Sequence, residues 1–296
     1  MKTKLLEFLV CPYCSSDLKV INSKSVKGDI ISGSLICVKC NDKFSIIDGI
    51  PRFLNKSKNY KTKESFSYEW DFYKYSDSQK KYYENQIIDF LKEDKSYFKD
   101  KMILEVGCGL GRQTQAIVPF CKDLFVLDIS NSVDKLPKIV NLHPIQCDIM
   151  SIPLKAKSFD FIYSRGVFHH TPSTRQAFEN SVKLVKNGGK MVFSIYPRRN
   201  FVFHSLNLFV RFFTVKFNHR FLFFLCKIMA PVVPVCYKLM NPDKNRPLEY
   251  WESVWLLFDW FSPKYQFHIS ENELDDYIKD YKLISSSRGY RKIFIS

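Results

Sequence analysis

The 296-residue sequence predicts an α/β fold with a mostly parallel sheet, preceded by a small metal-binding region. A short apolar run, 102–106, leads directly into a glycine-rich turn and a helix-like segment, which is the local order of a βαβ unit. Two Cys-x-x-Cys pairs within the first 40 residues indicate a thiolate site. Apolar residues make up 46% of the chain and charged residues 25%, so we expect a globular protein.

The N-terminal region, 1–54, carries the two cysteine pairs, Cys11 with Cys14 and Cys37 with Cys40. Two tight turns that face each other with two thiolates each form a tetrahedral sulfur site, which suits structural Zn²⁺. A redox dithiol pair and unrelated buried cysteines are the alternatives. Because the region is too small for a secure core, we expect the metal to supply much of its folding energy.

Gly49, Ile50 and Pro51 follow the second cysteine pair. With this tail, residues 5–54 resemble the small zinc-ribbon family known as an activating partner of tRNA and protein methyltransferases. Residues 55–63 are polar and basic, and we expect them to form a linker.

An aromatic cluster at 65–73 and a predicted helix at 80–94 follow the linker. The apolar stripe of that helix consists of Tyr83, Ile87, Ile88 and Leu91. We expect most of these side chains in the core. The alternative is that a helix here lies over the ligand pocket of the next domain.

The turn after the 102–106 run contains Gly107, Gly109 and Gly111, and glycines allow backbone N–H groups to approach a ligand closely. The dinucleotide fingerprint requires a sixth-position glycine, where this sequence has Arg112. Glu105, just before the turn, would repel a pyrophosphate and attract the ammonium of an amino-acid moiety. The pattern therefore favours S-adenosylmethionine over NAD.

Acidic residues also follow the next two predicted strands. Asp128 lies 21 positions after Gly107, a spacing that suits a pair of ribose hydroxyls. Asp148 is placed to accept from an adenine amino group, and Ile149 to pack on the ring. Each carboxylate alone is more often a helix cap or turn residue. At successive strand ends they indicate one ligand, since open α/β sheets bind ligands outside the carboxyl ends of their strands.

Residues 101–196 resemble a class I S-adenosylmethionine-dependent methyltransferase of the quinone-biosynthesis type. Beyond the glycine turn, 158–164 matches the fourth strand of that family and 184–193 its fifth. The resemblance implies a Rossmann-like, mostly parallel seven-stranded sheet, with the zinc ribbon before it and a helical insert before the last helix. The expected cofactor-binding residues are Glu105, Gly107, Cys108, Gly109, Gly111, Asp128, Ile129, Asp148, Ile149 and Ser164.

His169 and His170 follow the fourth strand, near the expected methyl position, and are the candidate catalytic residues. A hydroxyl acceptor needs a base, and histidine suits that role near neutral pH. The alternative is that they cap or pack the following helix. The preceding segment, 164–167, lacks the Pro-Pro-aromatic pattern that grips exocyclic amines. The cysteines outside the ribbon are expected to be buried apolar residues: Cys108, Cys121, Cys147, Cys226 and Cys236.

Residues 197–262 form a basic aromatic insert, in which 198–246 hold nine Lys/Arg and one Asp. This composition suits an interfacial helix at a membrane surface, a lid over the acceptor, or additional core. No uncharged apolar run reaches 18 residues, so we expect no membrane-spanning helix. The segment 259–268 resembles methyltransferases that accompany glycan and lipid-glycan assembly, which makes three residues candidate acceptor contacts: His204, Tyr265 and His268.

The sequence therefore predicts a cytoplasmic methyltransferase with a zinc ribbon at 1–54, a linker at 55–63 and a catalytic domain at 64–296. The expected acceptor is a small molecule or a lipid- or glycan-linked metabolite, methylated on oxygen or carbon. The alternatives are an rRNA or tRNA methyltransferase and a non-catalytic scaffold at a membrane or protein partner. We expect loss of zinc to unfold 1–54 and to leave the cofactor site intact.

Overall fold

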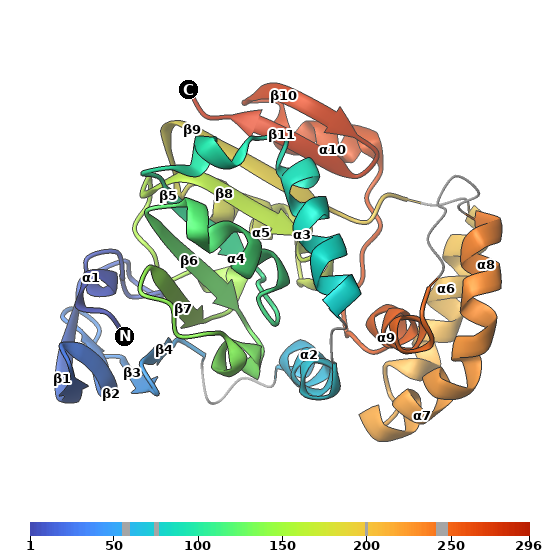
Figure 1. Ribbon diagram of the computed structural model, residues 1–296, viewed down its shortest axis with the longest axis horizontal. Coiled ribbons are helices and arrows are strands. Elements are labelled where there is room, and N and C mark those ends of the chain that lie inside the picture. The colour runs from blue at the N-terminus through green and yellow to red at the C-terminus, as the bar shows by residue number, and fades with distance from the viewer. Residues whose placement is uncertain (55–59, 74–76, 199–200, 241–247) are drawn as a thin grey trace.

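The computed structural model describes residues 1–54, 60–73, 77–198, 201–240 and 248–296. The side chains of 77–83, which include Tyr83, of 201–203 and of 239–240 lie outside this description. The described strands form one sheet in the order β1-β2-β3-β4-β7-β6-β5-β8-β9-β11-β10. The chain begins at one end of this sheet, and the helices of the insert lie at the opposite end of the molecule (Figure 1).

The N-terminal strands form an antiparallel meander beside the short helix α1 (Thr3–Leu6). Its strands are β1 (Leu18–Val26), β2 (Asp29–Cys37), β3 (Lys43–Ile47) and β4 (Ile50–Arg52). The two cysteine turns lie at one end of the meander, before β1 and after β2. The expected ribbon architecture is confirmed.

The central part of the sheet consists of parallel strands, as predicted. They are β5 (Met102–Val106), β6 (Asp123–Asp128), β7 (Leu142–Gln146), β8 (Phe159–Arg165) and β9 (Val185–Ser194). Every residue of β5 is buried, which is typical of a parallel strand covered by helices on both faces. The last two strands, β10 (Lys282–Ser287) and β11 (Tyr290–Phe294), add an antiparallel edge and complete the seven.

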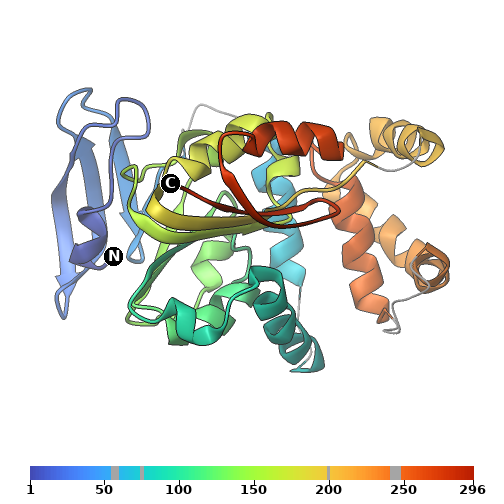
Figure 2. The ribbon, with the colours of Figure 1, turned by 90° about the horizontal axis from the view of Figure 1, so that it is seen from above.

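Helices cover both faces of this sheet, and Figure 2 shows α10 on one face and α3 on the other. They are α3 (Asp77–Leu91), α4 (Arg112–Ile117), α5 (Thr174–Val182) and α10 (Glu271–Ile278). Helix α2 (Lys61–Phe72) lies at the carboxyl ends of the parallel strands instead. Ile87 and Leu91 of α3 are buried, as its apolar stripe predicts. Because α2 begins at Lys61, the predicted linker ends earlier than residue 63; residues 55–59 lie outside the described chain.

The ribbon is joined to the sheet by more than a linker. Strand β4 pairs with β7 at Arg52 and Gln146, and the Phe53 N–H donates to the Gln146 carbonyl at 2.8 Å. Lys4 forms an ion pair with Asp123 at the start of β6. One hydrophobic cluster contains residues of both parts, including Leu9, Phe44 and Phe53 from the ribbon and Phe125 and Ile145 from the sheet. The two parts therefore share a core.

The insert is helical, as expected, and consists of α6 (Phe201–Thr214), α7 (His219–Met229), α8 (Val233–Met240) and α9 (Tyr250–Phe261). Its core joins Phe223 and Cys226 of α7 to Trp255 and Phe258 of α9, with Tyr68 of α2 packed against them. Cys236 of α8 is exposed, which corrects the expectation that the cysteines outside the ribbon are buried.

Within the described residues, the helical run His219–Lys238 is long and apolar enough to cross a membrane, judged by length and composition alone. The search for an uncharged apolar run of 18 residues missed this segment because Lys227 interrupts it.

Candidate active site and metal centre

The four cysteines of the ribbon converge on one point. The Sγ atoms of Cys11 and Cys40 are 3.6 Å apart, those of Cys14 and Cys37 are 3.4 Å apart, and those of Cys14 and Cys40 are 3.7 Å apart. Tetrahedral zinc with Zn–S bonds of about 2.3 Å separates its sulfurs by about 3.8 Å. Backbone N–H groups of Lys39 and Cys40 also point at the Cys37 sulfur, each at 3.4 Å. The donor set therefore fits a structural zinc ion with a closed coordination shell.

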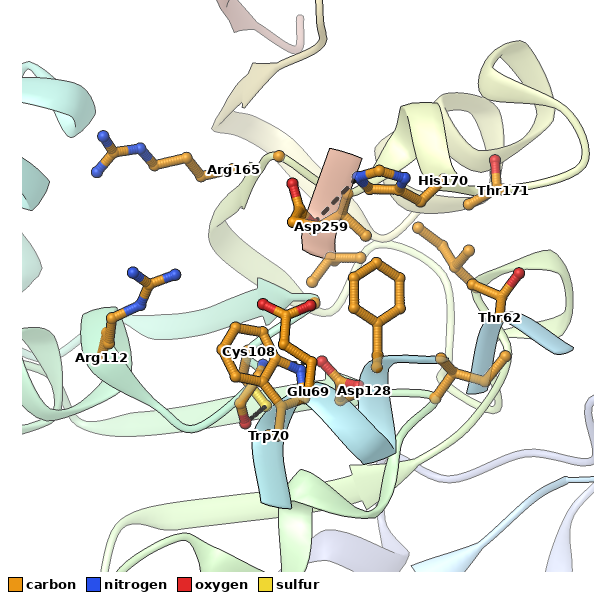
Figure 3. Close-up of a pocket in the computed structure, with 18 of the residues that line it drawn as sticks. Thr62, Glu69, Trp70, Cys108, Arg112, Asp128, Arg165, His170, Thr171 and Asp259 are labelled. Atoms are coloured by element: carbon orange, nitrogen blue, oxygen red, sulfur yellow. Dashed lines mark hydrogen bonds and ion pairs between the residues drawn. The ribbon is translucent and has the colours of Figure 1, made fainter. Parts of the chain in front are cut away.

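A second site lies at the carboxyl ends of the parallel strands, where a cavity of about 570 Å³ opens. Residues that follow β5, β6, β7 and β8 form its floor, and side chains of α2 and α9 cover it. Figure 3 draws the side chains of Glu69 and Trp70, on α2, next to those of Cys108 and Asp128, and all four line the cavity. Helix α2, which contains most of the 65–73 aromatic cluster, thus lies over the pocket. This is the alternative given in the sequence analysis, in which a helix of this region covers the ligand pocket.

The glycine turn lets the chain backbone form the cavity floor. Gly107 has a φ of +80°, and a Cβ atom there would lie 2.2 Å from Cγ2 of Val167. At Gly109 a Cβ atom would lie 3.0 Å from the indole ring of Trp70, which lines the same cavity. A side chain at position 107 would therefore collide with Val167, and one at position 109 would occupy the space between the turn and Trp70 of α2.

Glu105, at the carboxyl end of β5, lines the cavity and is buried. Its Oε2 accepts hydrogen bonds from Thr114 Oγ1 at 2.5 Å and from Tyr163 OH at 2.9 Å. Burial raises the pKa of Glu105 to about 8, because desolvation disfavours the charged carboxylate. A cation that binds beside Glu105 would therefore stabilise the ionised form of this carboxyl group and lower its pKa.

Asp128 ends β6 and is held by the loops on either side of it. One carboxylate oxygen accepts from the Gly109 N–H at 2.8 Å, and the other accepts from the Ser130 N–H at 2.8 Å and its hydroxyl at 2.6 Å. A carboxylate can accept about four hydrogen bonds, so capacity remains toward the cavity that Asp128 lines.

The remaining predicted cofactor residues divide into two groups. Asp148, after β7, is buried and its Oδ1 accepts from the Met150 N–H at 3.0 Å. It lines the cavity together with Cys108, Ile129 and Ile149. Gly111 and Ser164 do not line it: Gly111 is the N-terminal cap of α4, and the Ser164 hydroxyl donates to the Val106 carbonyl at 3.1 Å.

The two candidate catalytic histidines lie in different surroundings. His169 is fully buried, stacks on Tyr196 with ring centroids 3.7 Å apart, and does not line the cavity. His170 lines it, and its Nδ1 lies 3.0 Å from the Tyr265 carbonyl oxygen. Because a carbonyl only accepts, the neutral ring carries its proton on Nδ1 and leaves a lone pair on Nε2.

Asp259 of α9 also lines the cavity, next to His170. Its Oδ1 lies 3.7 Å from His170 Nε2, as the dashed line in Figure 3 marks. Its Oδ2 accepts from Tyr196 OH at 2.9 Å. Burial lowers the pKa of His170, and the nearby Asp259 carboxylate opposes that shift. A neutral imidazole beside a carboxylate is the arrangement of a general base whose protonated form is stabilised.

Sequence reasoning missed Glu69, Arg112 and Asp259 as cavity residues. The Glu69 carboxyl is buried in the cavity wall, and desolvation together with Asp259 raises its pKa well above the usual value. The guanidinium of Arg112 lies 5.8 Å from the ring centre of Trp70. Only Arg112 carried a local signal, its place in the glycine turn. Glu69 and Asp259 come from distant helices that only the fold brings together.

Of the three candidate acceptor contacts in the C-terminal region, Tyr265 lines the cavity. His268 is buried, with its ring 5.7 Å from that of Trp260 and 5.7 Å from that of His204. Neither of these two histidines is part of the cavity wall.

Two family models match the chain. A model described as "Methyltransferase domain" matches residues 104–193, and one described as "Trm112p-like protein" matches residues 2–49. A ubiquinone biosynthesis O-methyltransferase of Coxiella burnetii is 31% identical over 125 residues, which is 40% of this chain and 49% of that protein. The chain thus spans about half the length of this curated relative.

A tRNA (carboxymethyluridine(34)-5-O)-methyltransferase of Xenopus tropicalis is 26% identical over 114 residues, 38% of this chain and 17% of that protein. Among solved structures, a complex of the Haloferax volcanii Trm112 activator with a putative methyltransferase gives a TM-score of 0.39. It has 18% identity and covers 49% of this chain and 66% of that chain. A putative S-adenosylmethionine-dependent methyltransferase of Methanococcus maripaludis gives 0.45, with 15% identity over 82% of this chain and 97% of that chain.

Proposed function

We propose that this chain methylates a hydroxyl oxygen of a small, largely apolar acceptor. The chain contains a Trm112p-like zinc-binding domain followed by a class I S-adenosylmethionine-dependent methyltransferase domain. The observation that carries the proposal is one cavity lined both by the carboxylates at the strand ends and by the His170–Asp259 pair. The Coxiella relative is an O-methyltransferase by name, which supports the same chemistry.

The floor of the cavity suits the cofactor. Glu105 would hold the methionine ammonium, Asp128 the ribose hydroxyls and Asp148 the adenine amino group. Gly107 and Gly109 line the cavity, and a Cβ atom there would meet Val167 or Trp70, so the turn requires glycine at both positions. The cofactor supplies an electrophilic methyl group on a positively charged sulfonium, and a carboxylate-rich cavity favours that charge.

His170 is the proposed general base. Its Nε2 lone pair would take the proton of the acceptor hydroxyl as the acceptor oxygen receives the methyl group that the cofactor supplies. Asp259 stabilises the imidazolium that results, and the proton then passes to solvent. Tyr196 fixes the orientation of Asp259 through its hydroxyl. An enolised carbon acceptor would use the same base, so methylation on carbon would require no change of residues.

The walls around His170 indicate the character of the acceptor. The Phe66 ring lies 5.2 Å from that of His170, and further aromatic and aliphatic side chains line the same cavity: Tyr237, Leu248, Trp255 and Leu256. A wall of this kind favours an apolar ring or chain, either free or linked to a lipid, over a nucleotide phosphate. An anionic substituent or a glycan-linked phosphate would contact one of the basic residues that also line the cavity: Lys61, Arg112, Arg165 and Lys264.

The test uses S-adenosylmethionine with a tritiated methyl group, incubated with the purified chain and a cell extract. We expect tritium in an organic-solvent extract, and a His170→Ala variant that loses about 10²- to 10⁴-fold in transfer while cofactor binding is unchanged. His219→Gln, a histidine outside the cavity wall, is the matched control and should keep full activity.

The pH profile gives a second readout. Because burial lowers the pKa of His170, transfer should stay constant near neutral pH and fall only below the ordinary histidine range. Tritium in RNA would contradict the proposed acceptor class. Cofactor binding without transfer to any fraction would favour the scaffold alternative, and full activity of His170→Ala would remove the proposed base.

A further inference from the structure

Helix α6 presents its polar side to the protein and its apolar side to solvent. The inward stripe consists of His204, Asn207, Arg211 and Thr214, at helical spacing. Arg211 donates to the carbonyl of Trp260 and, at 2.6 Å, to that of Pro263, and Asn207 donates to Gln266 Oε1 at 3.1 Å. A helix on the surface of a soluble domain normally has the opposite orientation, with its apolar stripe toward the core.

The outward side of α6 is occupied by large apolar residues. Their side chains are between 46% and 65% exposed: Leu206, Leu208, Phe209, Phe212 and Phe213. The hydrogen bonds of Arg211 and Asn207 prevent a simple rotation that would bury these residues. The exposure is therefore a property of the fold, and it leaves a face that water solvates poorly.

Large exposed apolar residues also occur on α7 and α8, which lie at the same end of the molecule as α6 (Figure 1). They are Phe221, Phe224, Ile228, Met229, Val232 and Val235. In the most apolar 18-residue stretch of the helical run His219–Lys238, only 22% is buried within the structure. We call the exposed apolar residues of α6, α7 and α8, taken together, the insert face.

The charges on the insert face have one sign. Residues 201–240 contain five basic residues and no Asp or Glu. One of these, Arg211, faces inward; Lys216, Arg220 and Lys238 are exposed, and Lys227 is half-buried. Lys216 extends over the ring of Phe212 with its ammonium 3.8 Å from the ring centre, so charge and apolar surface are adjacent.

We propose that the insert face binds the surface of an anionic lipid bilayer, with α6, α7 and α8 lying in the interfacial plane. Apolar side chains would enter the acyl boundary, while the lysine and arginine side chains reach the anionic headgroups. A second copy of this chain is a poorer occupant, because a two-fold contact would place basic residues against basic residues with no acidic partner in 201–240.

An in-plane position agrees with the rest of the insert better than a crossing does. The inward side of α7 packs on α9 through Leu222, Phe223 and Cys226. For α7 to cross a bilayer, these residues would have to leave the hydrophobic core that they form with α9. Tyr237 of α8 also lines the cavity while Val235 lies on the insert face. If the proposed methyl transfer holds, the acceptor enters the cavity from the membrane beside α8; vesicle binding itself does not depend on that activity.

The experiment is flotation of the full chain through a density gradient with vesicles of stated composition. One set contains phosphatidylcholine alone, and the other contains about one-third phosphatidylglycerol. The chain should float with the anionic vesicles, less with the neutral ones, and less in high salt. Phe209→Ser/Phe212→Ser should lower binding about tenfold or more, and Lys216→Gln/Arg220→Gln several-fold on anionic vesicles only.

The control variant is Ile47→Ser/Val140→Ser, which removes exposed apolar residues outside the insert and should float like the unaltered chain. Unaltered thermal unfolding would show that each variant remains folded. The proposal is overturned if the unaltered chain does not float, or if the Phe209/Phe212 variant floats equally well. It is also overturned if alkaline, high-salt washing fails to release the chain, which indicates a crossing helix. If the unaltered chain sediments as a dimer and only the Phe209/Phe212 variant is monomeric, the insert face binds a second copy of the chain instead of a membrane.

Discussion

The two ends of the molecule carry similar charge but differ in what their apolar residues do. Residues 1–63 hold twelve Lys/Arg against five Asp/Glu, and 198–246 hold nine against one. In the ribbon, Lys2, Lys4 and Arg52 form ion pairs with Asp29, Asp123 and Asp134. In the insert, 201–240 contain no acidic residue, and large apolar side chains point outward. Net charge alone therefore does not identify a binding surface; its coincidence with exposed apolar surface does.

The ribbon's dependence on its metal gives the largest expected effect. Cys11→Ser/Cys37→Ser, or a zinc chelator, removes a metal whose binding free energy in zinc-finger peptides is about 10–16 kcal/mol. Because Phe44 and Phe53 share a cluster with Phe125 and Ile145, we expect a lower, single unfolding transition for the whole chain.

Calorimetric scanning with and without chelator measures this directly. The result revises the sequence-based expectation that only residues 1–54 unfold, because that expectation assumed separate cores. A ribbon that unfolds alone, while the remaining transition and cofactor binding stay unchanged, would restore it.

A matched pair of phenylalanines compares the two ends with one substitution. Phe44 is 5% exposed in the shared core, whereas Phe212 is 61% exposed on the insert face. Phe44→Ser should lower the free energy of unfolding by about 3–5 kcal/mol. Phe212→Ser should change it by no more than about 0.5 kcal/mol. Urea unfolding measures both values, and equal losses would show that the insert face is packed.

The raised pKa of Glu105 gives a smaller effect, which depends on pH. With a folded-state pKa of about 8 and an ordinary value of 4.5, the folded chain binds more protons than the unfolded chain between these values. Stability of the unliganded chain should therefore fall as pH rises through that window. A bound ammonium favours the carboxylate, so cofactor binding at pH 7 should release a proton.

Titration calorimetry in two buffers of different ionisation enthalpy counts that proton. Glu105→Gln should bind the cofactor without proton release and with little dependence on pH. Thr114→Val removes one hydrogen bond to Glu105 but leaves its carboxyl group in place, so it should still release the proton. Equal proton release by Glu105→Gln would place the titrating group elsewhere.

The sequence predicted the parts of this molecule that depend on neighbours along the chain. The cysteine turns, the glycine turn and the acidic strand ends at Glu105, Asp128 and Asp148 follow from local spacing, and parallel strands bring their carboxyl ends to one edge. Asp259 could not be paired with His170 in advance, because 89 positions separate them in the sequence. The polar inward stripe of α6 could not be distinguished from an ordinary core stripe without the partners of Arg211.

The proposed activity requires a cofactor held between the glycine turn and the carboxylates at the strand ends. Titration calorimetry of S-adenosylmethionine against the unaltered chain, Asp128→Ala and Asp134→Ala tests it most directly. We expect one binding site, an affinity about tenfold or more weaker in Asp128→Ala, and no change in Asp134→Ala, whose carboxylate pairs with Arg52 outside the cavity wall. No binding by the unaltered chain, or equal binding by Asp128→Ala, would contradict the account.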